Sequence, residues 1–317
     1  MKRIFSLIIS VLLLLFQHSY AEAQESTADC PLVITNFKNN PLPNHPDTLK
    51  ILGIGNSFTD DGMQYLPDLL KSAGIENVTL GKLSLGGCSL ERHYRLYASG
   101  EAAYNYVKSY AGKNAWEVSE NPCTFKKAVA DENWDIIVIQ QVSQNAGIYE
   151  TYQPYLDQLI VAITAHCTNA GVCLAWQMTW AYGTGSSHEG FANYNRNQAA
   201  MYRAILKTAK TMIAQTGIDL LIPSATAIQN IRATRVNNPP LDITRDGFHI
   251  DLGVGRYTLA CTWFQALIAP CLGRTVAGNP FRTANGNLPV TDDNFSLCQQ
   301  AAQYACIKRF EVSLIDE

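Results

Sequence analysis

Short apolar runs alternate with helix-length segments along most of this chain, and this alternation is the feature that most constrains its fold. The clearest run is Asp135–Gln140, which holds four consecutive apolar, mostly β-branched residues. A run of this kind is typical of a strand that is buried on both faces. Strands that alternate with helices predict a mostly parallel sheet covered on both sides. We therefore expect an α/β protein built as a three-layer α/β/α sandwich.

The positions of the expected elements follow from the two hydrophobic periodicities. We expect strands at 49–55, 78–85, 135–140, 172–178 and 219–222, and helices at 62–73, 155–170, 193–215, 252–267 and 293–309. Ser224 is expected to be the N-cap of a further helix. No internal repeat, low-complexity tract or linker indicates a second domain, so residues 48–317 are expected to form one domain.

The N-terminal residues have the pattern of a secretory signal peptide. Lys2 and Arg3 precede an apolar stretch, and small residues end the segment 1–23. Residues 24–47 are polar and contain three prolines, which predicts a poorly structured lead-in. No later segment approaches the ~20 apolar residues of a membrane span. We expect a secreted or periplasmic protein without an integral membrane segment after cleavage.

Charge and cysteine content exclude several classes of partner. The formal net charge of −3 gives no electrostatic case for binding nucleic acid or anionic membranes. Nine cysteines in an exported chain make some disulfides plausible, and their odd number leaves at least one thiol unpaired. Neither a Cys-x-x-Cys pair nor a zinc-type Cys/His spacing occurs. The pair His188-Glu189 is interpreted as a solvated loop, so neither a metal nor a cofactor is expected.

Four polar clusters follow expected strands, at the carboxyl edge where open parallel sheets bind ligands. They are 56–57, 86–88, 140–145 and 177–180. Far along the chain, Asp246 precedes His249 by three residues. Serine, histidine and aspartate are the parts of an activated hydroxyl nucleophile. Each has a simpler interpretation alone, Ser57 as a helix N-cap and His249 as a structural histidine. Their combination with the sheet edge favours catalysis.

These residues resemble motifs of a known superfamily. Gly55-Asn56-Ser57-Phe58 after the first strand and Asp246-Gly247-Phe248-His249 near the end resemble the SGNH/GDSL hydrolases. The blocks 86–93, 134–147, 222–230 and 246–257 also look like one secreted SGNH-type family of glycan-degrading bacteria. The resemblance covers roughly residues 49–268. It implies an SGNH-type, flavodoxin-like sandwich and a serine hydrolase.

The resemblance also implies roles for individual residues. Ser57 would be the nucleophile, His249 the general base, and Asp246 the residue that orients the imidazole. The oxyanion donors would be the backbone N–H groups of Ser57 and of Gly87, for which Gly86 also fits. A side-chain amide would complete them. Where the superfamily has Gly-x-Asn-Asp, this chain has Val-Ser-Gln-Asn at 142–145, so the third donor would be Gln144 or Gln141.

The same reasoning places three residues around the substrate, namely Asn56, Arg92 and Trp180. An exposed Trp180, or Tyr182 beside it, would suit stacking on a sugar ring. We expect a serine esterase that removes O-acyl groups, in particular O-acetyl groups, from a carbohydrate through an acyl-enzyme. One alternative is a lipid or thioester acyl hydrolase, which would prefer long acyl chains. The other is a non-catalytic carbohydrate-binding protein on the same fold, suggested by the atypical third block.

Overall fold

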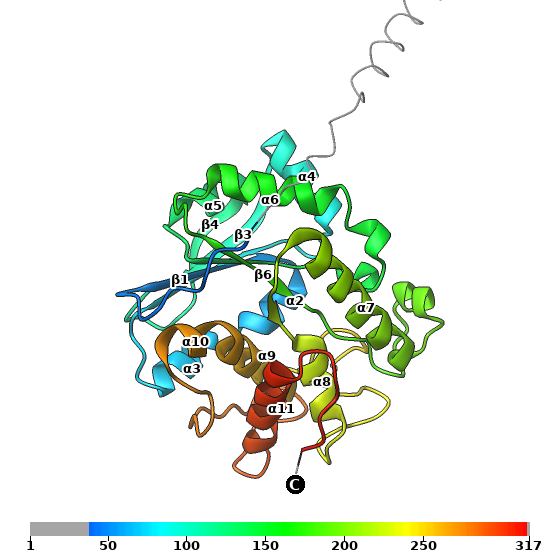
Figure 1. The fold of residues 1–317 in the computed structure, drawn as a ribbon. Coiled ribbons are helices and arrows are strands. Elements are labelled where there is room, and N and C mark those ends of the chain that lie inside the picture. The colour runs from blue at the N-terminus through cyan, green and yellow to red at the C-terminus, as the bar shows by residue number, and fades with distance from the viewer. Residues whose placement is uncertain (1–37, 316–317) are drawn as a thin grey trace, which may run out of the picture. The chain divides into compact units, whose positions relative to one another are not determined.

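Five neighbouring strands run parallel at the centre of the molecule, and an antiparallel hairpin extends one edge of the sheet (Figure 1). The structure, a computed structural model, describes residues 38–315. The sheet order is β4-β3-β2-β1-β5-β6-β7. The strands are β1 (Leu49–Gly55), β2 (Val78–Ser84), β3 (Ala102–Ser109), β4 (Glu117–Thr124), β5 (Ile136–Ile139), β6 (Cys173–Gln177) and β7 (Leu220–Ile222). The expected mostly parallel α/β sheet is confirmed.

Helices cover both faces of the sheet, as the apolar strands require. One layer contains α4 (Leu90–Ser99), α5 (Phe125–Asp131) and α6 (Tyr155–His166). The opposite layer contains α2 (Ser57–Met63), α3 (Leu66–Ser72), α8 (Ser224–Arg232), α9 (Val254–Trp263), α10 (Ala269–Leu272) and α11 (Phe295–Ile307) (Figure 1). The long helix α7 (Gln198–Thr216) lies beside β6. Short segments complete the fold: the 3₁₀ segments η1 (Ser143–Asn145), η2 (Tyr149–Thr151) and η3 (Glu189–Tyr194), and the π-helical η4 (Phe264–Ile268).

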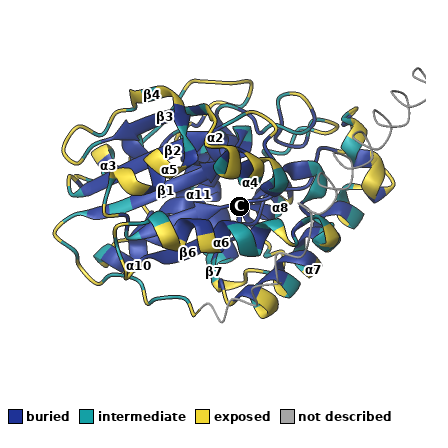
Figure 2. Ribbon diagram, turned by 90° about the horizontal axis from the view of Figure 1, so that it is seen from above, coloured by how far each residue is buried: buried dark blue, intermediate teal, exposed yellow. Residues whose placement is uncertain are grey.

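Burial follows these layers. Figure 2 shows the central strands in dark blue, with the exposed residues on loops and on the outer faces of helices. All four residues of β5 are buried, and so are all seven of β2. β1 pairs with β2 in parallel register from Leu49↔Val78 to Gly55↔Ser84. The carboxyl ends of β1 and β2 therefore lie side by side, which brings the segments that follow them to one edge.

The hairpin β3–β4 and the helices α4 and α5 were not expected from the sequence. β4 reads Glu-Val-Ser-Glu-Asn-Pro-Cys-Thr, and most of its residues are exposed. An edge strand of this composition lacks the apolar alternation by which strands are predicted. The hairpin adds the two antiparallel strands to the parallel core and carries Trp116 onto Gln64, where the indole N–H donates to the backbone carbonyl at 3.0 Å.

Several expected helices differ in their bounds. The helix expected at 193–215 begins only at Gln198, and the one expected at 252–267 is α9 followed by the π-helical η4. The helix expected at 62–73 is two short helices, because α2 ends at Met63 and Pro67 stands in the first turn of α3. Ser224 is the first residue of α8 rather than its N-cap, which is Pro223, and the buried Ser224 hydroxyl has no hydrogen-bond partner among the described residues.

Other expectations concern cysteines and termini. The eight cysteines within residues 38–315 form no disulfide with one another. Cys30, the segment 1–23 and most of the segment 24–47 lie outside the described residues. In the described part of the chain, no helix is both long and apolar enough to span a membrane.

Candidate active site

The turn after β1 presents Ser57 at the carboxyl edge of the sheet. Asn56 has extended backbone angles and caps α2, accepting a hydrogen bond from Phe58 N–H on its side-chain Oδ1 at 3.0 Å. The Asn56 carbonyl accepts from the N–H groups of Thr59 and Asp60. Ser57 is thus the first helical residue and not the N-cap, which corrects the simpler interpretation of this serine. Its own N–H has no acceptor among residues 38–315.

His249 joins this serine to Asp246. The Ser57 hydroxyl lies 2.9 Å from His249 Nε2, and His249 Nδ1 lies 2.7 Å from Asp246 Oδ2. Asp246 Oδ1 accepts from the backbone N–H groups of Phe248 and His249 at 3.1 and 2.7 Å. Residues 192 positions apart in the sequence therefore meet in hydrogen-bond reach. An Nδ1–H that donates to the carboxylate leaves the Nε2 lone pair for the serine proton.

The pKa of the Asp246 carboxyl is lowered. Partial burial raises it, but the hydrogen bond from the His249 side chain and those from the Phe248 and His249 backbone outweigh burial. Asp246 is therefore ionised at neutral pH. An ionised partner fixes the imidazole tautomer and favours its protonated form once the serine proton has been taken up.

Buried aromatic side chains pack against the loop that carries His249. Trp180 is completely buried, stacks on Phe58 with ring centroids 4.0 Å apart, and donates its indole N–H to the Phe248 carbonyl at 2.8 Å. The expectation that Trp180 is an exposed surface for a sugar ring is therefore wrong. Tyr182 is buried as well. The cluster after β6 serves the core because both faces of its rings are already packed.

The Asn56 side chain makes its hydrogen bonds inside the protein. Its Oδ1 accepts from Gln140 Nε2 at 2.7 Å, and its Nδ2 donates to the Cys88 carbonyl at 3.0 Å. Gln140 Oε1 in turn accepts from the Thr59 hydroxyl at 2.9 Å. Asn56 is 2 % exposed. It is a structural cap and not the substrate contact that the sequence suggested.

Of the two glutamines expected to complete the oxyanion hole, Gln141 is bound elsewhere. Gln141 Oε1 accepts from the backbone N–H groups of Leu90 and Val142, and its Nε2 donates to the Thr151 carbonyl at 3.0 Å. Nε2 also donates to the Thr151 hydroxyl at 3.2 Å, so this buried side chain has no N–H left for an oxyanion and its expected role is wrong. Gln144 packs its Cβ against Gly190. Its role as an oxyanion donor stays a prediction.

Sequence reasoning missed Gln140 as the residue that connects to the Ser57 turn. A signal existed, because Gln140 is the first residue after the β5 strand. Polar residues at that position face the sheet edge where neighbouring turns meet. What the sequence could not show is the direction of consecutive side chains in the irregular segment Gln140–Asn145.

The glycine pair after β2 lies next to the Ser57 turn. Leu85 N–H donates to the Gly55 carbonyl at 3.1 Å, which ties the two strand ends together. Gly87 has a positive φ of 63°, and both Gly86 and Gly87 are exposed with no neighbour where a Cβ would stand. The Gly87 N–H has no acceptor among the described residues. Arg92 is exposed on the first turn of α4, and its role toward a substrate stays a prediction.

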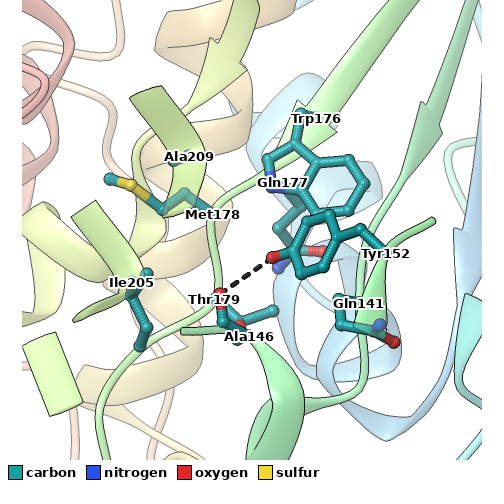
Figure 3. Close-up of a pocket in the computed structure, with 9 residues that line it drawn as sticks. All are labelled: Gln141, Ala146, Tyr152, Trp176, Gln177, Met178, Thr179, Ile205 and Ala209. Atoms are coloured by element: carbon teal, nitrogen blue, oxygen red, sulfur yellow. Dashed lines mark hydrogen bonds between the residues drawn. The ribbon is translucent and has the colours of Figure 1, made fainter. Parts of the chain in front are cut away.

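The triad lies near the surface rather than in an enclosed cavity. Ser57 and His249 are partly exposed, and Asp246 is exposed. An internal void nearby is lined by Gln141, Gln177 and Thr179 among others, with the Tyr152 hydroxyl donating to the Ala146 carbonyl at 2.8 Å (Figure 3). This void has no room for a water molecule, and no triad residue lines it. It is a packing gap between β6 and α7.

Comparison with known proteins places the chain. The sequence profile described as "Domain of unknown function (DUF4886)" matches residues 50–304. The chain belongs to the DUF4886 family. A DUF4886 family protein from Bacteroides uniformis ATCC 8492, whose crystal structure is solved, is 38 % identical with a TM-score of 0.76. The match covers 84 % of this DUF4886 chain and 98 % of that chain.

Solved structures with lower sequence identity match a smaller share of the chain. A protein from Slackia heliotrinireducens proposed to be an SGNH hydrolase is 21 % identical, with a TM-score of 0.46, over 69 % of this chain and 98 % of its own. Axe2, an acetylxylan esterase from Geobacillus stearothermophilus, is 13 % identical, with a TM-score of 0.46, over 71 % and 96 %. At these TM-scores the likenesses decide neither the fold nor the activity of this DUF4886 protein. The comparison with curated proteins finds no match.

Within the described residues of this DUF4886 protein, no group of three or more His, Cys, Asp or Glu side chains is arranged to hold a metal ion.

Proposed function

We propose that this protein is a serine esterase in which Ser57, His249 and Asp246 form the catalytic triad. The observation that carries the proposal is the continuous chain of hydrogen bonds from Ser57 Oγ through the His249 ring to Asp246 Oδ2, at 2.9 and 2.7 Å. A nucleophile within reach of a base, with the base oriented by a third group, is the recurring arrangement of acyl-transfer enzymes.

The proposed reaction has two steps. His249 Nε2 takes the Ser57 proton while Oγ attacks the ester carbonyl, and the imidazolium then gives that proton to the departing alcohol. Water next attacks the acyl-serine, its proton passes to Nε2, and the carboxylic acid leaves as Ser57 regains its hydrogen. Asp246 stabilises the imidazolium in both steps through the 2.7 Å hydrogen bond.

Two backbone N–H groups are suited to hold the oxyanion. The Asn56 cap occupies the N–H groups of Phe58, Thr59 and Asp60, and leaves that of Ser57 without an acceptor. Gly87 offers a second such group from the turn that Asn56 Nδ2 binds through Cys88. Donors of this kind are typically worth about 3 kcal/mol each in the transition state. Gln144 remains the proposed third donor.

The proposed substrate is an O-acylated, in particular O-acetylated, glycan. Three features support it: the partly exposed triad, which a bulky polymer can approach, the weakly acidic net charge, and the sequence resemblance to secreted SGNH-type proteins of glycan-degrading bacteria. The leader-like segment 1–23 supports a secreted or periplasmic location. The burial of Trp180 means that sugar recognition in this proposal does not use that ring.

Hydrolysis of p-nitrophenyl acetate by the wild type and by Ser57→Ala tests the triad. We expect the wild type to turn over the ester and the variant to lose activity to background, with an unchanged circular dichroism spectrum. Retained turnover in the folded variant would refute the assignment of the nucleophile.

A second assay tests the substrate class. Acetate release from acetylated xylan and from other acetylated polysaccharides is compared with hydrolysis of p-nitrophenyl octanoate. We expect acetyl esters to be preferred, because the proposed substrate carries O-acetyl groups. A preference for octanoyl esters would instead indicate a lipid or thioester acyl hydrolase.

A further inference from the structure

Asp61 is a buried carboxylate outside the triad that contacts residues next to Asp246 and His249. Asp61 is on α2, one helical turn after Ser57, and its side chain is 0 % exposed. A carboxylate in such a place is retained only when charges and hydrogen bonds compensate its burial. Its partners therefore indicate what it does.

Those partners come from the two ends of the loop that carries Asp246 and His249. Arg245 Nη1 lies 3.1 Å from both carboxylate oxygens of Asp61. Ile250 N–H donates to Asp61 Oδ2 at 3.3 Å. Arg245 and Ile250 flank the loop immediately before Asp246 and after His249, so one carboxylate holds both of its ends.

The loop ends are also bound to each other. Arg245 Nη1 donates to the Ile250 carbonyl at 2.5 Å, and Arg245 N–H donates to the His249 carbonyl at 2.9 Å. A second cation, Arg256 on α9, donates from Nε to Asp61 Oδ1 at 2.8 Å. The guanidinium groups of Arg245 and Arg256 thus both bind the Asp61 carboxylate. Arg245 is next to the loop of Asp246 and His249, whereas Arg256 is on α9.

We propose that Asp61 is a positioning residue that fixes the His249 loop to the helix of the nucleophile. This inference rests on the proposed function and deepens it. Ser57 and Asp61 share α2, so the charge that holds Arg245 and Ile250 sets the distance from His249 Nε2 to Ser57 Oγ. Changes of about 1 Å in such a distance cost roughly 100-fold in rate.

The first test compares Asp61→Asn with Asp131→Asn. Asp131 is the control because it accepts hydrogen bonds from the buried Lys108 at 2.9 Å and from Tyr106 at 2.8 Å, on the β3 side of the sheet. We expect Asp61→Asn to lower kcat for p-nitrophenyl acetate about 10- to 100-fold, with KM within about 2-fold. Asp131→Asn should lower Tm while leaving kcat within about 2-fold. Equal kcat losses in the two variants would overturn the proposal.

The second test separates the two cations that bind Asp61. Arg245→Gln removes the contact to the catalytic loop, whereas Arg256→Gln removes a contact to the same carboxylate from α9. We expect a clearly larger fall in kcat for Arg245→Gln at matched folded fraction. A larger effect of Arg256→Gln would show that the cluster only stabilises the fold.

A readout independent of turnover separates this inference from the proposed function. The proton on His249 Nδ1, shared with Asp246, should give a low-field proton NMR signal in the wild type. We expect Asp61→Asn to shift or broaden this signal while Asp131→Asn leaves it unchanged. An unchanged signal in Asp61→Asn overturns the positioning role. An inactive wild type that shows the signal and loses it in Asp61→Asn would refute the esterase proposal alone.

Discussion

Neutral buried hydrogen bonds hold Ser57 in place, whereas charged contacts hold the loop of His249. The turn that carries Ser57 is built from neutral groups in the core: Asn56, Gln140 and Thr59 are all buried and bonded to one another. The loop that carries His249 is partly exposed and is held by charges, with Arg245 and Asp61 at its base. Substitutions of the buried residues that hold Ser57 should therefore cost mainly stability, and substitutions in the loop of His249 should cost mainly turnover.

Among substitutions that keep both Ser57 and His249, Asp246→Asn is expected to have the largest effect, and Asp246 lies in the loop. An amide still accepts the backbone hydrogen bonds of Phe248 and His249, but it removes the charge that stabilises the imidazolium and allows the wrong tautomer. We expect kcat to fall between about 10² and 10⁴-fold. The free energy of unfolding should change by less than about 1 kcal/mol, since Asp246 is exposed.

Steady-state kinetics and urea denaturation of the same preparation check this prediction. If Asp246→Asn unfolds easily but turns over normally, the contrast between the loop and the turn is wrong.

Asn56→Ala should show the opposite pattern, with a large loss of stability. It removes the cap of α2 and leaves Gln140 Nε2 and the Cys88 carbonyl without their partner. A lost cap costs about 1 kcal/mol and each buried unsatisfied group about 1–3 kcal/mol. We expect the unfolding free energy to fall by about 3–7 kcal/mol.

Asn56→Ser is the matched variant for this position. Serine is a good N-cap and can still accept from Phe58 N–H, but its short side chain cannot bind both Gln140 Nε2 and the Cys88 carbonyl. We therefore expect it to recover about 1 kcal/mol of the stability that Asn56→Ala loses in chemical denaturation. Equal losses in both variants would show that the cap of α2 does not help to hold the turn.

The sequence predicted the buried parallel strands and the meeting of the triad residues, but not the exposed hairpin. The parallel strands were predictable, because buried strands such as Ile136–Ile139 are apolar along their whole length. The meeting of Ser57 with Asp246 and His249 was predictable from residue types and the sheet edge. The hairpin β3–β4 was not, since its outer strand is polar and exposed.

Side-chain directions were the part that sequence could not supply. Gln140 and Gln141 are adjacent and chemically identical, yet one binds Asn56 and the other binds Leu90 and Thr151. Trp180 follows a strand like a ligand-binding residue, yet stacks on Phe58 in the core. These outcomes depend on packing between segments that are far apart in the chain, which no local pattern records.

A smaller effect is expected of pH on the free energy of unfolding, through the buried His93. His93 on α4 is buried, and its Nδ1 lies 2.9 Å from the Tyr104 hydroxyl. Burial, with a smaller contribution from the charge of Arg92, lowers the pKa of His93 to about 3. The unfolded chain takes up a proton at the ordinary histidine pKa while the folded protein does not. Stability from this group is complete above pH ~6.5 and is lost as pH falls toward 3.

The expected size is up to about 1.4 kcal/mol per pH unit, or roughly 2 kcal/mol between pH 6.5 and 4.5. Urea denaturation of the wild type and of His93→Gln at both pH values checks it, because carboxylates such as Asp246 titrate in both proteins. We expect the variant to lose less stability on acidification. Parallel pH profiles would contradict the neutral buried state of His93.

The most direct test of the triad is covalent labelling by a fluorophosphonate, read by intact mass and peptide mapping. The account predicts one adduct on Ser57 in the wild type, none in Ser57→Ala, and labelling slowed at least about 100-fold in His249→Ala. Absence of an adduct in the folded wild type, or an adduct on another residue, would contradict a Ser57–His249–Asp246 nucleophile.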